Sequence, residues 1–257
     1  ADESPHRLAR LFVGIGCPRR EFVRAAMDVR VLVPVEVHQA VDHRLRLLRR
    51  RGVVEPDQRP PVDALGEQRE IAVLKRLTDV LDSLGIPYAI GGSIASSMYG
   101  TVRFTRDADL GVLPFAPAAD RFYNLLKGEF YINEQAMQQA LAYSSNFSII
   151  HFATAFKIDL FVLGPSEFEQ QILFRSRIVR LGDSEEGDLC FVSPEDVILL
   201  KLRQLNEPDA NREQQWYDIQ GVLLVQGEAL DLEYLETWAR RLDLSDLLDR
   251  AFEETSA

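Results

Sequence analysis

Apolar residues between positions 67 and 87 recur at helical spacing. From Glu67 onward, successive apolar positions lie three or four residues apart, as on the buried face of a helix. They are Ile71, Leu74, Leu77, Val80 and Leu81. In the segment Leu84-Gly85-Ile86-Pro87, a glycine just past the pattern and a proline soon after are typical of a helix end. The pattern therefore predicts a helix that packs on a sheet.

Residues 87–112 predict a strand, a turn, a helix, a loop and a second strand. The first strand is the short apolar run Tyr88 to Ile90, which Gly91 and Gly92 interrupt. Ser93 is a good N-cap for a helix from Ile94 to about Tyr99. Such a turn exposes backbone N–H groups at the positive end of a helix dipole, which suits a phosphate.

The second strand of this stretch, Asp107 to Val112, carries two acidic residues. Side chains two apart in a strand point the same way, so Asp107 and Asp109 share one face. Ala108, Leu110 and Val112 fill the other face. Two neighbouring carboxylates on a rigid strand favour a hard divalent cation, Mg²⁺ first and Mn²⁺ as the alternative.

A third acid follows in the strand-like run Phe156 to Val162. Asp159 sits there among alternating apolar residues, where a charge is costly unless it is paired or bound to metal. Asp159 is therefore the candidate that completes a two-metal site with Asp107 and Asp109.

The rest of the chain from residue 113 alternates helix and strand patterns before it becomes helical. Helices are predicted at Ala118 to Leu126, with Phe122 and Leu125 inward, at Glu167 to Leu173, and from the N-cap Ser193 through Gln204. Strands are predicted at 147–152 and 156–162, as an antiparallel pair, and at 178–181 and 189–192. Further amphipathic helices are predicted at 213–225, 232–242 and 246–252.

The order of these motifs resembles the nucleotidyltransferase superfamily of the DNA polymerase β type. That family combines a Gly-Gly or Gly-Ser turn opening a helix, an Asp-x-Asp on the next strand and a third acid on a later strand. This chain has Gly91-Gly92-Ser93, Asp107-Ala108-Asp109 and Asp159. The form Gly-Gly-Ser-x-Ala, followed by Arg-Phe-Thr-Arg-Asp-x-Asp, is most similar to the small bacterial branch of AbiEii-like toxins and minimal nucleotidyltransferases.

The resemblance implies an α+β (α/β) nucleotidyltransferase fold, in which helices flank a small mixed sheet and a helical region follows. It implies a catalytic domain at 66–205 and a C-terminal helical region at 206–257. Residues 1–65 are an arginine-rich extension, which is either loosely ordered or a small docking element.

The implied activity is transfer of a nucleoside monophosphate from an NTP to an acceptor hydroxyl. Asp107, Asp109 and Asp159 would be the catalytic, metal-binding acids. The nucleotide-binding candidates are Gly91, Gly92, Ser93, Arg103, Arg106 and Lys201. The acceptor stays open between RNA such as tRNA, protein and a small molecule. A toxin–antitoxin role would add a cognate toxin or antitoxin as partner.

The composition of the chain bears on its expected partners and location. A net charge of −11 argues against broad, charge-driven binding to nucleic acid, although a locally basic groove could hold RNA. The only cysteines, Cys17 and Cys190, are far apart and form no metal-binding pattern. No apolar run is long enough for a membrane span. We therefore expect no membrane partner and a cytoplasmic location.

Two other functions are compatible with the motifs. One is a non-catalytic relic that binds a nucleotide or a partner, such as an antitoxin. The other is a serine hydrolase, because Gly91-x-Ser93-x-Ala95 after a strand is close to a nucleophile elbow. That second function requires a late histidine on a loop, and the only histidine after Ser93 is His151, within a predicted strand.

Overall fold

The structure, a computed structural model, describes residues 64–103, 105–180, 188–208 and 210–256. The predicted extension at 1–65 lies almost wholly outside these residues. In chain order the elements are α4 (Ala64–Ser83), β1 (Tyr88–Ile90), α5 (Gly92–Tyr99), β2 (Asp107–Val112), η1 (Ala116–Ala118), α6 (Ala119–Leu126), β3 (Phe130–Ile132), α7 (Glu134–Tyr143), β4 (Asn146–His151) and β5 (Lys157–Val162). They continue with α8 (Glu167–Phe174), β6 (Arg177–Arg180), β7 (Asp188–Phe191), α9 (Pro194–Gln204), α10 (Arg212–Gln226), η3 (Gly227–Ala229), α11 (Leu232–Arg241) and α12 (Ser245–Ser256).

The strands form one mixed sheet of seven strands in the order β3-β4-β5-β2-β1-β7-β6. Strand β2 runs antiparallel to β1 and parallel to β5, and β5 runs antiparallel to β4. Strand β7 is parallel to β1 and antiparallel to β6. The predicted α+β class, a mixed sheet flanked by helices with a helical region after it, is confirmed.

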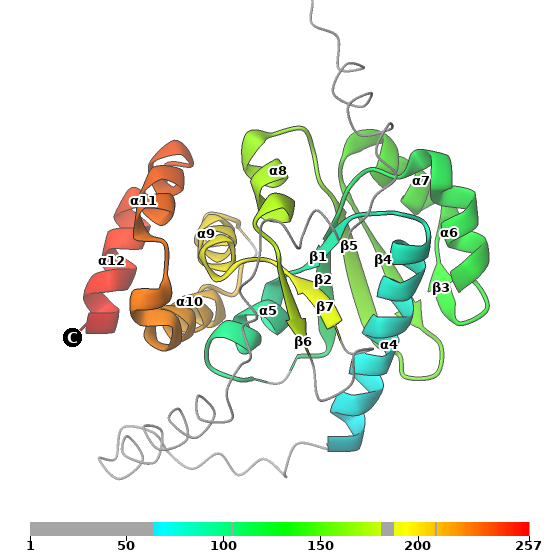
Figure 1. Cartoon of the computed structure of the whole chain (residues 1–257), viewed down its shortest axis with the longest axis horizontal. Helices are drawn as coiled ribbons and strands as arrows, with labels where there is room; N and C mark the ends of the chain where they lie inside the picture. Colours follow the sequence, from blue (N-terminus) through cyan, green and yellow to red (C-terminus); the bar gives the residue numbers. More distant parts are fainter. Residues whose placement is uncertain (1–63, 104, 181–187, 209, 257) are drawn as a thin grey trace, which may run out of the picture. The chain divides into compact units, whose positions relative to one another are not determined.

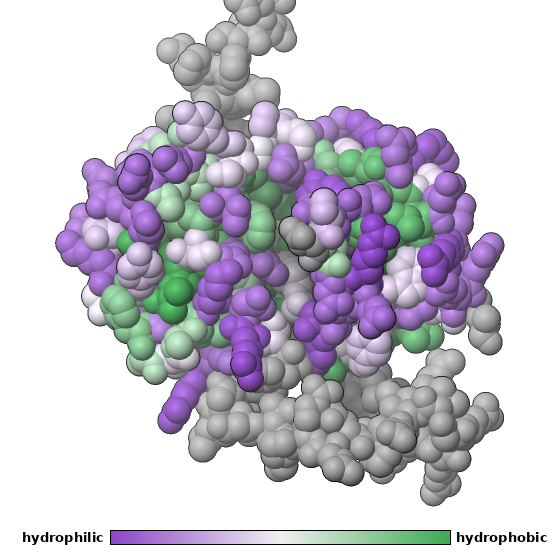
Figure 2. Space-filling view, turned by 180° about the vertical axis from the view of Figure 1, so that it is seen from behind, coloured by the Kyte–Doolittle hydropathy of each residue, from purple (hydrophilic) through white to green (hydrophobic). Residues whose placement is uncertain are grey.

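Helices lie on both sides of the sheet. Figure 1 shows α4, α6 and α7 on one side, and α5, α9 and α10 on the other. The first side is the apolar one, because Leu110 of β2, Ile158 of β5 and Ile149 of β4 are fully buried. The alternate residues of each strand point to the second face. Among them, Lys157 and Phe161 of β5 and Ile150 of β4 are exposed, so this face is open over β4 and β5. The face seen in Figure 2 is largely hydrophilic, with hydrophobic residues in separate patches among the hydrophilic ones.

Helix α10 is part of the same hydrophobic core as the sheet. Its residues Ile219 and Val222 are fully buried in one cluster with Ile198 of α9 and Ile90 of β1. At Gly100 the end of α5 comes so close to α10 that an added Cβ would lie 2.7 Å from the backbone of Gly221. The helical region after residue 205 therefore contributes to the packing around the sheet. The predicted domain boundary at 205/206 stays a prediction.

Two local predictions are wrong. The helix α5 begins at Gly92, with Gly91 and not Ser93 at its N-cap, and the hydroxyl of Ser93 instead accepts a hydrogen bond from the guanidinium of Arg103. Leu125 is 46% exposed, whereas its neighbour Leu126 faces the core, since the buried face of α6 is formed by Ala119, Phe122 and Leu126, at i, i+3 and i+7. The strand β3 and the helix α7 were not predicted at all.

No helix in the part of the chain that the structure describes is both long and apolar enough to cross a membrane.

Candidate active site

The three predicted acids lie together on two neighbouring parallel strands. Asp109 of β2 is the register partner of Asp159 of β5, so their side chains leave the same face of the sheet side by side. Asp107 lies two residues before Asp109 and therefore shares that face. The acids thus stand where the helix-covered part of this face meets its open part.

Lys157 occupies the same face and was not singled out from the sequence. It is the register partner of Asp107, and its Nζ lies 2.7 Å from Oδ2 of Asp159. The other oxygen of Asp159 accepts a hydrogen bond from the hydroxyl of Ser148, its register partner on β4. The hydrogen bond to Asp159 raises the pKa of Lys157 above its usual value. Asp159 is therefore held by a lysine and a serine.

The Gly91-Gly92 turn places the beginning of α5 directly against Asp109. The amide of Gly91 donates a 2.8 Å hydrogen bond to the carbonyl oxygen of Asp109. A Cβ added to Gly92 would lie 1.8 Å from Oδ2 of Asp109, which means that the carboxylate fills the space beside the Gly92 backbone. Gly92 also has a positive φ, which glycine adopts without steric cost. Both features require glycine at this position.

Burial and neighbouring charges raise the pKa of Asp109 to about 6. Burial contributes most, followed by the carboxylates of Asp107 and Asp159, while Lys201 and Lys157 act in the opposite direction. A buried carboxylate with two further carboxylates beside it favours a nearby cation.

Ser93 and Arg103 contact each other at the other end of the turn. The guanidinium of Arg103 donates to the hydroxyl of Ser93 and, in a bidentate pair of 2.9 and 3.1 Å, to the carboxylate of Asp218 in α10. The amide of Arg103 also donates to the hydroxyl of Ser97. Helix α10 thus fixes the loop that follows α5. Arg106 is exposed and does not line the cavity described below.

Lys201 reaches the site from α9 and is almost fully buried, with 3% of its surface exposed. Its Nζ lies 2.7 Å from Oδ2 of Asp218 and donates a 2.9 Å hydrogen bond to Oε1 of Gln215. Burial lowers the pKa of Lys201, although Asp218 opposes that shift. Burial alone would raise the pKa of Asp218, but the hydrogen bonds and charges of Arg103 and Lys201 lower it below the usual value.

Lys201 and Arg103 therefore share one carboxylate, that of Asp218. The cluster lies next to the Gly92 turn, because Lys201, Gly91, Gly92 and Asp109 line one cavity. Two cations near the N-terminal end of a helix suit an anion.

Asp218 was missed by the sequence analysis although the sequence contains a signal for it. Gln215, Asp218, Ile219 and Val222 recur at helical spacing, which places an acid on the inward side of the predicted helix. A buried acid needs a cationic partner. The partners, Arg103 and Lys201, lie on other elements, so helical spacing alone could not name them.

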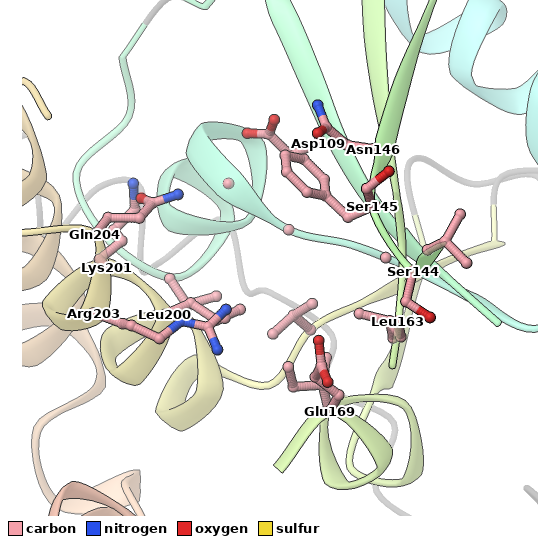
Figure 3. Close-up of a pocket in the computed structure, with 18 residues that line it drawn as sticks. Asp109, Ser144, Ser145, Asn146, Leu163, Glu169, Leu200, Lys201, Arg203 and Gln204 are labelled. Carbon is pink, nitrogen blue, oxygen red and sulfur yellow. The ribbon is translucent and has the colours of Figure 1, made fainter. Parts of the chain in front are cut away.

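The cavity has a volume of about 220 Å³ and lies between the sheet, α8 and α9. Figure 3 shows Asp109 at one end and Glu169 of α8 at the other, with Lys201, Leu200 and Arg203 of α9 facing Ser144 and Leu163 across it. Its middle is apolar, and its polar residues lie at the ends and the rim. A phosphorylated compound with an apolar or aromatic part fits these walls.

A divalent metal fits the chemistry of the acids, since Mg²⁺ and Mn²⁺ prefer oxygen ligands and the mutual repulsion of the carboxylates favours a cation. Among the described residues, no group of three or more His, Cys, Asp or Glu side chains is already arranged around one point to hold a metal. Lys157 instead contacts Asp159 at 2.7 Å. By its chemistry, the set of three carboxylates fits a divalent metal.

The serine-hydrolase alternative finds no support in the geometry. The hydroxyl of Ser93 contacts Arg103, and the Nδ1 of His151 is hydrogen-bonded with the hydroxyl of Thr154 at 2.9 Å. The ring of His151 packs 5.1 Å from that of Phe130. His151 is therefore occupied elsewhere, and the other histidines of the chain lie outside the described residues.

No protein-family model matches the sequence, and no curated protein matches it. Among solved structures, the antibiotic-resistance factor ANT(2'')-Ia has a TM-score of 0.45 and 13% identity, over 74% of this chain and 96% of that chain. A nucleotidyltransferase-like protein from Paracoccidioides brasiliensis has a TM-score of 0.44 and 19% identity, over 72% and 92%. The lincosamide antibiotic adenylyltransferase LnuA, with lincomycin bound, has a TM-score of 0.37 and 10% identity, over 60% and 94%.

Two of these names, nucleotidyltransferase-like protein and adenylyltransferase, belong to the class that the sequence resembles. With TM-scores below 0.5, the similarity is too weak to assign an activity to this chain. It also gives no support for the AbiEii-like branch.

Proposed function

We propose that this protein is a nucleotidyltransferase that moves a nucleoside monophosphate from an NTP to an acceptor hydroxyl, with Mg²⁺ or Mn²⁺ as cofactor. The observation that carries the proposal is the register of Asp109 and Asp159 on β2 and β5, directly beside the Gly92 turn. It brings a carboxylate pair and a phosphate-binding helix end to one place. Phosphoryl transfer needs little more than positioning and charge neutralisation, which these groups can supply.

The triphosphate would lie along the Gly91-Gly92 turn. The first N–H groups of α5 have no partner within the helix and point toward it. Arg103 and Lys201 supply positive charge, and Asp218 holds both cations in position. Arg106 lies next to Asp107 in the sequence and is exposed. It would approach the outer phosphates from solvent.

The acids would hold the metal ions. Asp107 and Asp109 would bind the ion on the triphosphate, and Asp159 would share a second ion with them. When bound, such ions neutralise phosphate charge and lower the pKa of an attacking hydroxyl. Lys157, whose Nζ lies 2.7 Å from Oδ2 of Asp159, would compete with such an ion for that carboxylate.

The acceptor belongs to one of three classes: RNA such as a tRNA, a protein, or a small molecule. The open half of the sheet face, which begins next to Asp159, gives an acceptor access to the acids. A toxin–antitoxin partner and a cytoplasmic location are further parts of the proposal, and they depend on the acceptor that is found.

Incubation with each α-³²P-labelled NTP, Mg²⁺ and total bacterial RNA and protein tests the activity. We expect label in an RNA or protein band, or in a small product separated by thin-layer chromatography. The label should disappear with Asp107→Ala and with Asp109→Ala. If Asp109→Ala transfers label at the rate of the unchanged protein, the assignment is wrong.

A non-catalytic, antitoxin-like relic is the second candidate, and Lys157 is the observation that favours it. A lysine that already neutralises Asp159 could replace a metal permanently. Calorimetric titration with nucleotide, with and without Mg²⁺, separates the two functions. Binding that does not depend on Mg²⁺, together with no transfer, would favour the relic.

A further inference from the structure

The hydroxyl of Ser148 in β4 directly contacts the third acid of the site. It donates a hydrogen bond to Oδ1 of Asp159, its register partner on β5. Asp159 is in turn the register partner of Asp109 on β2. Register partners on neighbouring strands lie side by side, with their side chains on the same face of the sheet. The hydroxyl and the two acids therefore form one row across three strands.

This row ends at the glycine turn. The carboxylate of Asp109 fills the space beside the backbone of Gly92, where the proposed triphosphate lies. Counted from the turn outward, the row places a helix end that suits a phosphate, two acids and then the hydroxyl of Ser148 side by side. A nucleotidyl transfer needs an attacking hydroxyl held next to the acids and in line with the phosphate and its leaving group. Ser148 supplies such a hydroxyl from the chain itself.

Ser148 also lies where the sheet face is open. Alternation along β4 buries Phe147 and Ile149 on the apolar side. It leaves Asn146 and Ile150, next to Ser148 on its own face, exposed, and Ser148 itself is half-buried. A nucleotide joined to the hydroxyl would therefore extend toward solvent and leave the core packing in place.

We infer that Ser148 is an acceptor of the protein's own reaction, so that the chain nucleotidylylates itself at this serine. The Oγ of Ser148 attacks the α-phosphorus of the NTP. The bond from the α-phosphorus to the oxygen that bridges to the β-phosphate breaks, and pyrophosphate leaves. The proton of the hydroxyl passes to Asp159, which already accepts its hydrogen bond. The product is a phosphodiester that joins Ser148 to the nucleoside.

This inference rests on the proposed function, because it takes the reaction and the phosphate position from it, and it names one acceptor. A serine that only holds Asp159 in place would make the same hydrogen bond. The two roles differ in one observable result, since only an acceptor becomes covalently labelled.

Incubation of the purified full chain with Mg²⁺ and each NTP, labelled with ³²P on either the α- or the γ-phosphate, tests the inference. Nucleotidyl transfer leaves the α label, and not the γ label, on the chain's own band. Peptide mass spectrometry of the unchanged protein then locates the added nucleotide, and this measurement needs no variant. Total bacterial RNA and protein are offered in a parallel incubation.

The variants are Ser148→Ala and Asp109→Ala, which remove the acceptor and the metal-binding acid. The matched control is Ser83→Ala, which removes an exposed hydroxyl at the end of α4, on the other side of the sheet. Thermal unfolding checks each fold.

We expect α label on the chain's own band, in the peptide that contains Ser148. The label should fall to background in Ser148→Ala and in Asp109→Ala and stay unchanged in Ser83→Ala. Because the hydroxyl and the acids belong to one chain, the labelled fraction at a given time should not change when the protein is diluted.

Label on other acceptors with none on the chain itself would overturn the inference and leave the proposed function intact. Label that maps to another residue, persists in folded Ser148→Ala, or rises with protein concentration would overturn the inference in the same way. Label from the γ-phosphate alone would indicate phosphoryl transfer and overturn both the inference and the proposed function. Both also fail if no NTP labels the chain or any other acceptor.

Discussion

The Nζ of Lys201 in α9 lies 2.7 Å from Oδ2 of Asp218 in α10, and both side chains are almost fully buried. The same carboxylate receives the guanidinium of Arg103. A helix from the C-terminal region thus determines where two cations stand relative to the Gly92 turn. The site is built from the sheet, the helix after β1 and the two helices after β7 together.

Replacing Asp218 with asparagine should destabilise the protein. The substitution preserves shape but leaves Lys201 buried without its carboxylate, and breaking a buried ion pair typically costs about 3 kcal/mol or more. Urea unfolding would measure the change. The control is Asp79→Asn, which removes an exposed pair with Lys75 within α4 and should cost less than about 0.5 kcal/mol. Equal effects of the two substitutions would show that the buried pair does not stabilise the fold.

The contribution of Asp218 should also depend on pH. Its pKa in the folded protein is lower than usual, so the unfolded chain takes up the proton first as the pH falls. The stabilisation is therefore complete above the unfolded pKa of about 3.9 and is lost as the pH falls through the folded pKa. Unfolding of the unchanged protein and of Asp218→Asn should be compared between pH 7 and pH 3. The stability difference between them should shrink below about pH 4; a constant difference would contradict the lowered pKa.

Alanine at Gly92 should be far more harmful than alanine at Gly91. Its Cβ would lie 1.8 Å from Oδ2 of Asp109 and would force that carboxylate to move, whereas a Cβ at Gly91 would meet Val192 Cγ2 at 3.5 Å and the carbonyl oxygen of Asp109 at 3.9 Å, both ordinary contacts. Misplacing a catalytic group by about 1 Å can reduce a rate roughly 100-fold. Transfer of label from α-³²P-NTP should fall by that order in Gly92→Ala and little in Gly91→Ala.

A similar loss of transfer in both glycine variants would mean that the turn, rather than the position of Asp109, limits the reaction. Circular dichroism of both variants serves as the folding control.

Tyr234→Phe should destabilise the protein by about 1–3 kcal/mol. The Tyr234 hydroxyl donates a 2.6 Å hydrogen bond to the buried carboxylate of Asp196, whose other oxygen accepts from Ser193. Phenylalanine keeps the ring, over which the Arg175 guanidinium lies at 3.8 Å, and removes only the donor. Tyr217→Phe, at a 48% exposed position, is the control and should leave the urea midpoint unchanged. A midpoint for Tyr234→Phe equal to that of the control would contradict the role of this hydrogen bond.

Most elements around the site could be predicted because their sequence patterns are local. Strand β1 begins and ends where the apolar run does, and Ser193 followed by Pro194 marks the start of α9. The N-cap of α5 could not be predicted, because it depends on the conformation of Gly92 and on the carboxylate of Asp109 beside it. Strand β3 has only three residues, and it owes its existence to pairing with β4.

The candidate site also combines features that local sequence patterns predict with features that only tertiary contacts determine. The shared face of Asp107 and Asp109 follows from strand alternation, and the structure confirms it. The pairing of Asp109 with Asp159 depends on β2 and β5 becoming neighbours, and no local pattern specifies that register. The contacts of Asp218 with Arg103 and Lys201 join three separate elements, so they became visible only in three dimensions.

The position of Asp218 late in the chain has a consequence for synthesis. Proteins are made from the N-terminus onward, so the glycine turn and the acids leave the ribosome long before α10. Until α10 emerges and packs against α5 and α9, Lys201 and Arg103 lack the carboxylate that they share. A nascent chain therefore cannot complete this site before translation of α10 has finished.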